Sequence, residues 1–152
     1  MGIKLMVSIW PTVDEESENR EAMEEAGMLI RSERNTRYRQ LGDAAIIDVT
    51  NPETRKFVWN RIKENYYDKG IKIFWLDEAE PEYTVYDFEN YRYHLGPNVQ
   101  VGNVYPVMYA QAFFDGMKER GSGEYREPSA LRMGRQPEVW RTRMVRRHSF
   151  HI

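Results

Sequence analysis

Residues 71–82 constrain the fold of this chain most strongly, because an apolar run is followed at once by acidic residues. The run from Ile71 to Leu76 is apolar except for Lys72, and it lies between Gly70 and Pro81. This pattern predicts a short buried strand. Four acidic residues come directly after it: Asp77, Glu78, Glu80 and Glu82. A buried strand does not accept that charge, so the acids are expected at its C-terminal end, where chemistry collects in parallel α/β folds.

The segments before this strand predict a β-α-β unit. Residues 3–10 are expected to form a first strand, and residues 52–70 a helix that leads directly into the second strand. Thr50 or Asn51 can cap this helix, and Pro52 fits its first turn. A helix between two strands of one sheet implies parallel pairing and a right-handed crossover.

The remaining segments up to residue 120 follow a β-α-β-α order. Residues 14–26 predict a short surface helix capped by Gly27, and residues 28–45 an irregular excursion. Residues 83–103 predict a long aromatic loop, of a length that is usually functional. A second good helix is expected at residues 105–118, and its apolar face is predicted to hold Val107, Ala110, Phe114 and Met117.

The composition of the chain excludes some kinds of site and favours others. The chain has 152 residues, which suits one domain, and no cysteine, which excludes disulfides and thiolate metal sites. It shows neither a secretory leader nor an apolar run of membrane-spanning length, so a cytoplasmic location without a membrane partner is expected. Aromatic residues make up 13% of the chain. Next to acids they suit a surface that stacks on sugar rings, although many will belong to the core.

Charge is unevenly distributed along the chain. Residues 124–152 hold seven Arg and three Glu, a net charge of +4, whereas the first 123 residues have a net charge of −6. Such asymmetry is typical of a basic tail that binds nucleic acid. These arginines follow neither a helical nor a strand period, so nothing organises them into a binding face. We therefore do not expect a nucleic-acid partner.

The run from Phe74 to Pro81 resembles the nucleophile signature of glycoside hydrolase family 31. That signature is an apolar strand ending in an aromatic residue, an aliphatic residue and Asp, followed by two variable residues, Glu and Pro. Residues 7–11, 48–55 and 101–117 resemble three further blocks of the family, in family order. The resemblance covers about residues 1–120 and is closest to bacterial enzymes of the α-xylosidase or α-glucosidase type.

This resemblance implies an α/β fold in which residues 1–121 are a part of a (β/α)8 TIM barrel, from about strand 3 to helix 4. It implies that Asp77 is the nucleophile of a retaining α-glycosidase. Trp10 and Trp75 would line the sugar pocket, and Glu80 would orient the substrate-binding site. No cofactor or metal is expected. A retaining enzyme also needs a second carboxyl group roughly 5–5.5 Å from the first. In the family it lies in a Trp-Ser-Gly-Asp segment, which this sequence lacks.

The missing segment can be recovered by shifting the reading frame of the tail. Permitted codons for residues 131–152, read one base later, encode a Trp-Ser-Gly-Asp segment. Met133, Trp140 and Met144 each have a single codon, and all three fit. Our hypothesis is that the frame slips near residues 121–123 and that residues 122–152 form an irregular, out-of-frame tail. A slip of this kind also explains the excess of arginine.

Plainer interpretations stand beside these. Asp77 can be a solvated loop carboxylate or a cap for the following turn, and Trp10 and Trp75 can be core residues. The four acids could hold calcium, but the segment lacks the Gly and the ligand spacing of such sites. His94 is expected to be a hydrogen-bonded residue at a surface or interface.

We therefore expect a fragment of a retaining enzyme that hydrolyses α-glucosidic or α-xylosidic bonds of oligosaccharides. The fragment itself is expected to be inactive, because the acid/base segment is missing. A partial barrel leaves strand edges unpaired, which predicts self-association. The alternative is a non-catalytic carbohydrate-binding or interaction module.

Overall fold

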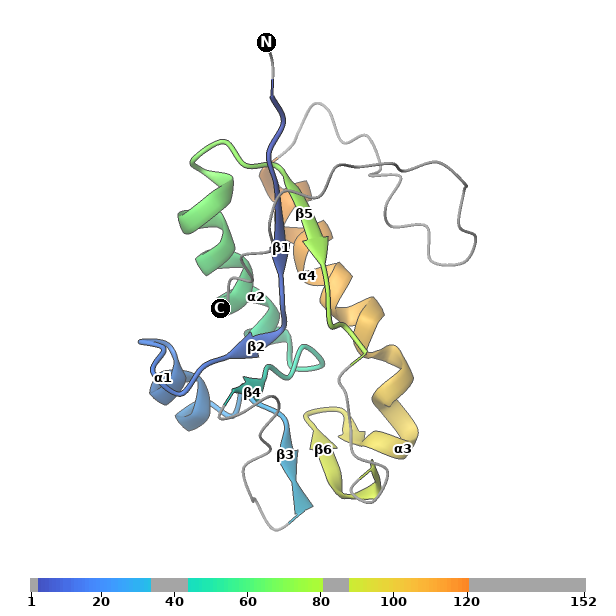
Figure 1. Ribbon diagram of the computed structural model, residues 1–152. Helices are drawn as coiled ribbons and strands as arrows, with labels where there is room; N and C mark the ends of the chain where they lie inside the picture. Colours follow the sequence, from blue (N-terminus) through green and yellow to red (C-terminus); the bar gives the residue numbers. More distant parts are fainter. Residues whose placement is uncertain (1–2, 34–43, 81–87, 121–152) are drawn as a thin grey trace.

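A small parallel sheet backed by two helices forms the centre of the molecule (Figure 1). The computed structural model describes residues 3–33, 44–80 and 88–120. Strands β1 (Met6–Ile9) and β5 (Ile73–Leu76) pair in parallel, from Met6 opposite Ile73 to Ile9 opposite Leu76. Helices α2 (Pro52–Ile62) and α4 (Tyr105–Arg120) cover one face of these strands. The predicted α/β class and the parallel β-α-β unit are confirmed.

The two faces of this sheet differ sharply in burial, because side chains alternate between them with a period of two. Val7 and Ile9 are buried against the helices, and their partners on β5 are half-buried. On the other face Met6, Ile73 and Trp75 are 49%, 40% and 54% exposed. The prediction of a buried second strand is therefore wrong for this face of β5, although Phe74 and Leu76 on the other face pack against the core. Within the described ranges, helices cover only the face that holds Val7 and Ile9. We call the opposite face, which holds Met6, Ile73 and Trp75, the open face.

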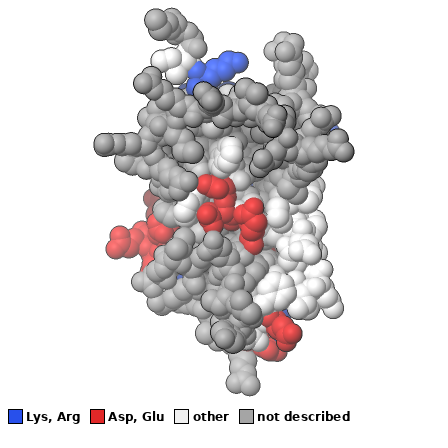
Figure 2. Space-filling view, turned by 45° about the vertical axis from the view of Figure 1, so that its right-hand side comes forward, with Lys and Arg blue, Asp and Glu red and all other residues white. Residues whose placement is uncertain are grey.

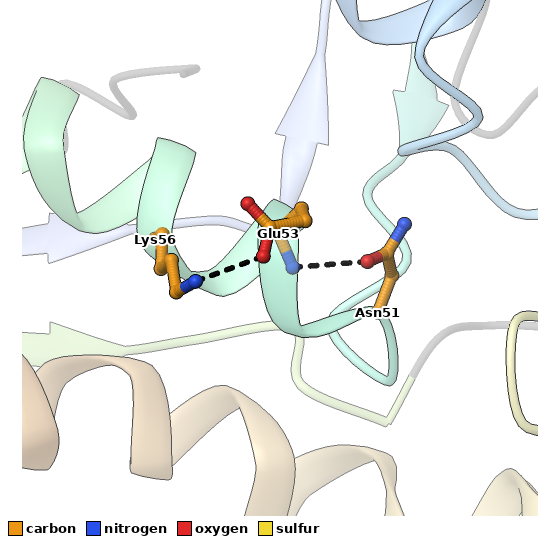
Figure 3. Close-up of polar contacts among 3 residues, drawn as sticks. All are labelled: Asn51, Glu53 and Lys56. Atoms are coloured by element: carbon orange, nitrogen blue, oxygen red, sulfur yellow. Dashed lines mark hydrogen bonds and ion pairs between the residues drawn. The ribbon is translucent and has the colours of Figure 1, made fainter.

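Helix α2 begins with the predicted cap. Asn51 has an extended backbone, and its side-chain oxygen accepts a hydrogen bond of 2.9 Å from the Glu53 N–H (Figure 3). Pro52 occupies the first helical position, where a missing N–H costs nothing. Glu53 also pairs with Lys56 one turn later, at 2.8 Å on the exposed side of the helix (Figure 3). The helix then widens into a π-helical turn, Lys63–Tyr67, before the chain reverses at Gly70.

Replacing Asn51 by Ala removes the acceptor for the Glu53 N–H. We expect Asn51→Ala to lower the free energy of unfolding by about 1 kcal/mol. The matched control is Asn60→Ala, the same chemical change at an exposed position inside the helix, which is expected to be neutral or slightly stabilising. Urea unfolding followed by circular dichroism measures both. Equal losses for the two variants would show that the cap contributes nothing.

Helix α4 occupies the predicted residues but buries a different face. Its buried side chains are aromatic or small, namely Tyr105, Tyr109, Ala112 and Phe113. Val107, expected in the core, is 48% exposed. The helix packs against α2, where Gly116 lies directly against the ring of Trp59.

Residues 12–46 differ from the prediction in two ways: the helix is shorter than expected, and part of the segment expected to be irregular forms strands. Helix α1 covers only Arg20–Glu25, because the segment before it forms turns in which Asp14 and Ser17 carbonyls accept backbone hydrogen bonds. Gly27 ends the helix with a φ of +64°, as predicted. Strand β2 (Thr12–Val13) pairs antiparallel with β4 (Ala45–Ile46). Part of the segment expected to be irregular, residues 28–45, therefore belongs to small sheets.

The segment expected to be a long aromatic loop is also largely structured. Strand β6 (Tyr91–Tyr93) pairs with β3 (Arg31–Ser32) on one side and with β7 (Gly96–Pro97) on the other. A 3-10 turn at Phe88–Asn90 precedes β6, and helix α3 (Asn98–Val101) with a second 3-10 turn at Gly102–Val104 leads into α4. The loop prediction is wrong for residues 88–103, and residues 83–87 lie outside the described part of the chain.

No helix among the described residues has the length and apolar character needed to cross a membrane.

Candidate active site

Asp77 lies immediately after β5 and is held by the first strand. Its backbone N–H donates a hydrogen bond of 3.1 Å to the carbonyl of Ile9, which extends the parallel pairing by one residue. The side chain is half-buried. The sequence-based placement of Asp77 at the C-terminal end of a parallel strand is therefore confirmed.

Alternation along the strands places three of the predicted site residues on the open face. Ile73 and Trp75 are exposed there. Because every second side chain of a strand points to the same face, Asp77 follows them on this face. On β1 the same rule places Trp10 after Met6 and Ser8, beside Asp77 in the parallel pairing. Trp10 is half-buried, and Trp75 is more than half exposed. The sheet thus brings two indole rings and one carboxylate to one face and one end.

The chain turns away from the sheet directly after Asp77. Glu78 has a φ of +52°, a left-handed conformation that is uncommon for a residue with a side chain. Glu80, predicted to orient the site, is exposed at the surface of this turn. Figure 2 shows acidic side chains gathered in the middle of the face that is turned forward. Local strain at Glu78 is typical of a functional segment that its surroundings hold in place.

The turn does not form a metal site. Within the described ranges, no group of three or more His, Asp or Glu side chains is placed to hold a metal ion. Glu82, the last of the four acids, lies outside these ranges.

A buried tyrosine lies behind Asp77. Tyr109 of α4 has no exposed surface, and its hydroxyl donates a hydrogen bond of 3.2 Å to the Ile9 carbonyl. Burial raises the pKa of Tyr109 well above its ordinary value, and the negative charge of Asp77 raises it further. This residue was not predicted from the sequence. The signal was available as aromatic residues at a spacing of four, Tyr105, Tyr109 and Phe113.

A second carboxylate, Asp48, is buried and connects the turn before α2 to the segment at His94. One oxygen accepts hydrogen bonds from the Thr50 hydroxyl (2.6 Å) and the Thr50 N–H (3.0 Å), and the other accepts from the His94 N–H (2.5 Å). Burial raises the pKa of Asp48, although these hydrogen bonds oppose the shift. His94 itself is exposed, as predicted, and is hydrogen-bonded through its backbone.

A parallel β-α-β unit with a carboxylate at the carboxyl end of a strand is the arrangement of α/β enzymes, which assemble their sites at that edge. The particular family follows from comparison with known proteins. A family model described as "Glycosyl hydrolases family 31 TIM-barrel domain" matches residues 1–143. The chain belongs to glycosyl hydrolase family 31, and the resemblance seen in the sequence is confirmed.

Curated relatives carry the same family name. The chain is 51% identical over 126 residues to an uncharacterized family 31 glucosidase, ORF2, of Pseudescherichia vulneris. The aligned region covers 82% of this chain and 24% of the relative. It is 32% identical over 148 residues to α-xylosidase A of Aspergillus niger, covering 85% and 20% of the two chains. The chain thus spans about a quarter or less of the length of these relatives.

Solved structures agree with this assignment. A family 31 α-xylosidase from a soil metagenome, complexed with xylose, matches with a TM-score of 0.73 and 61% identity, over 79% of this chain and 18% of that one. A xylosidase from Aspergillus niger matches with a TM-score of 0.67 and 31% identity, over 80% and 20%. The described α/β arrangement is therefore similar to part of these family 31 structures.

Proposed function

We propose that residues 1–121 are a segment of the catalytic barrel of a retaining α-glycosidase, from about its third strand to its fourth helix. The substrate class is α-xylosides or α-glucosides. One observation carries this proposal: Asp77 follows a parallel strand on the open face, beside Trp10 and Trp75. The 61% identity to an α-xylosidase complexed with xylose supports the substrate class.

In this proposal Asp77 is the nucleophile. Its carboxylate attacks the anomeric carbon of the sugar and forms a covalent glycosyl ester, while the bond to the leaving group breaks. The indole rings of Trp10 and Trp75 offer flat apolar surfaces to the sugar ring, and Glu80 orients the site. The open face is the inner face of the barrel, which the remaining strands of a complete enzyme would enclose.

The isolated chain is proposed to be inactive. A retaining mechanism requires a second carboxyl group that protonates the leaving oxygen and later activates water. Its loss removes a contribution of roughly 10² to 10⁴ in rate. Among the described residues, the open face is exposed and β1 and β5 pair only with each other, so self-association is proposed.

We also propose that the reading frame slips near residues 121–123. Residues 122–152 lie outside the described part of the chain. The family match runs to residue 143, so it does not itself support a slip at residues 121–123. Sequencing of the encoding DNA decides the question. A Trp-Ser-Gly-Asp segment in the neighbouring frame is the expected result, and its absence would refute the slip.

The activity is tested by completing the barrel. In a hybrid enzyme, residues 1–120 replace the aligned segment of the soil-metagenome α-xylosidase; we call this protein the hybrid. We expect the hybrid to hydrolyse an aryl α-xyloside or α-glucoside and the isolated 152-residue chain to show no turnover. Turnover by the isolated chain that disappears in Asp77→Asn would contradict the proposed inactivity. Saturable sugar binding by a monodisperse isolated chain would instead favour a binding module, for which exposed Trp75 is the suited surface.

A further inference from the structure

Three aromatic rings on α4 form a continuous column behind the sheet. Tyr105 and Tyr109 have no exposed surface and Phe113 has 4%. The ring centroids of Tyr105 and Tyr109 are 6.5 Å apart, and those of Tyr109 and Phe113 are 5.5 Å apart in an edge-to-face arrangement. Phe113 in turn packs against Phe74 of β5. Neighbours on both sides therefore fix the ring of Tyr109, so its hydroxyl points to one place.

That place is a single backbone carbonyl shared with the candidate nucleophile. The Ile9 carbonyl oxygen accepts two hydrogen bonds, one from the Tyr109 hydroxyl (3.2 Å) and one from the Asp77 N–H (3.1 Å). A carbonyl oxygen has two lone pairs, so both donors can be satisfied together. Tyr109 lies 100 residues from Ile9 in the sequence. The hydrogen bond thus connects α4 to the point where Asp77 leaves the sheet.

We propose that Tyr109 is a positioning residue for Asp77: through the Ile9 carbonyl, its hydroxyl fixes the backbone from which the nucleophile reaches the sugar. This inference rests on the proposed function of Asp77. Tyr109 is completely buried on the helix side of the sheet, so it does not touch the substrate. Its effect is geometric, and a nucleophile displaced by about 1 Å can lose roughly 10²-fold in rate.

The ionisation of Tyr109 suits this role. Burial and the charge of Asp77 both raise the pKa of the phenol, so the hydroxyl stays protonated and remains a donor over the working range of pH. The link between Tyr109 and Ile9 is therefore expected to hold its geometry without responding to pH.

The chain supplies a matched control on the same helix. Tyr105 is also fully buried, and its hydroxyl donates a hydrogen bond of 2.8 Å to a backbone carbonyl, that of Ile47. Tyr105→Phe removes an equivalent hydrogen bond one turn away, at a carbonyl that Asp77 does not use. A purely structural role predicts the same behaviour for both substitutions.

The experiment compares Tyr109→Phe and Tyr105→Phe in the hybrid, with thermal unfolding measured in parallel. We expect Tyr109→Phe to lower kcat by roughly 10- to 100-fold with KM changed by no more than about twofold, because the nucleophile and not sugar binding is disturbed. Tyr105→Phe is expected to lower the unfolding temperature similarly and to leave kcat within about twofold. Equal kcat values for the two variants would overturn the proposal.

A second measurement uses the 152-residue chain itself and does not depend on turnover. Amide hydrogen exchange at Asp77 is expected to accelerate at least tenfold in Tyr109→Phe relative to Tyr105→Phe, because the shared carbonyl is less well fixed. Unchanged exchange would refute the link. The two proposals fail separately: full turnover in Asp77→Asn overturns the proposed function, whereas loss of turnover in Asp77→Asn with no difference between the tyrosine variants overturns only the positioning role.

Discussion

Asp77→Asn is expected to reduce kcat/KM of the hybrid by at least about 10³-fold, the largest effect of any single substitution in the chain. Asparagine has the shape of aspartate and keeps the backbone N–H that pairs with Ile9. It lacks the charge and the oxygen needed to form a glycosyl ester. Turnover of an aryl α-xyloside measures the loss, and unfolding temperature shows that the fold is retained.

Two further variants separate nucleophilic loss from a general loss of charge. Asp115→Asn makes the same change at an exposed position on α4 and is expected to leave kcat/KM within about twofold. Asp77→Gly creates space at the site, so added azide can attack in place of the carboxylate and yield a β-glycosyl azide. Retention of more than about a tenth of the activity in Asp77→Asn would refute the role of Asp77.

Gly116→Ala is expected to lower the free energy of unfolding by about 2 kcal/mol, although alanine is the better helix former. A methyl group at this position would lie 2.2 Å from the ring atoms Cδ2 and Cε2 of Trp59, which is closer than any real contact. The gain in helix propensity is about 1 kcal/mol, and overpacking against a rigid indole costs roughly 3. Urea unfolding of the chain measures the difference.

A double-mutant cycle tests the cause of this loss. If the indole is the obstacle, Trp59→Leu should make Gly116→Ala less costly than it is in the original chain, because the two residues are in direct contact. Asp115→Ala, on the exposed side of the same helix, should change stability by no more than about 0.5 kcal/mol. Additive losses in the cycle would show that the cost has another source.

Local signals predicted those parts of the fold that local interactions determine. The cap at Asn51, the reversal at Gly27 and the pairing of β1 with β5 were all readable from residue types and spacing. The buried face of α4 was not, because tyrosine ranks low on hydrophobic scales. Tyr105 and Tyr109 are buried because distant carbonyls satisfy their hydroxyl groups.

The same distinction applies to the site. Asp77 was predicted because it follows its own strand directly, and family resemblance gave it a role. Tyr109 and Asp48 were missed because their partners are remote: 100 residues separate Tyr109 from Ile9, and 46 separate Asp48 from His94. The exposure of β5 was missed for another reason. A strand sequence that is suited to burial on both faces cannot show which neighbours are present to cover it.

The exposure of the open face should be visible in the tryptophan fluorescence of the chain. The chain has four tryptophans. Of these, Trp75 is 54% exposed and meets water, whereas Trp59 is 6% exposed and is enclosed by protein. Trp75 should emit at longer wavelength and be open to a dissolved quencher, whereas Trp59 should be shielded from it. Any polypeptide that covers the sheet would move Trp75 from the first condition to the second. In a variant that keeps Trp75 as its one tryptophan, the emission would therefore report whether the sheet is covered.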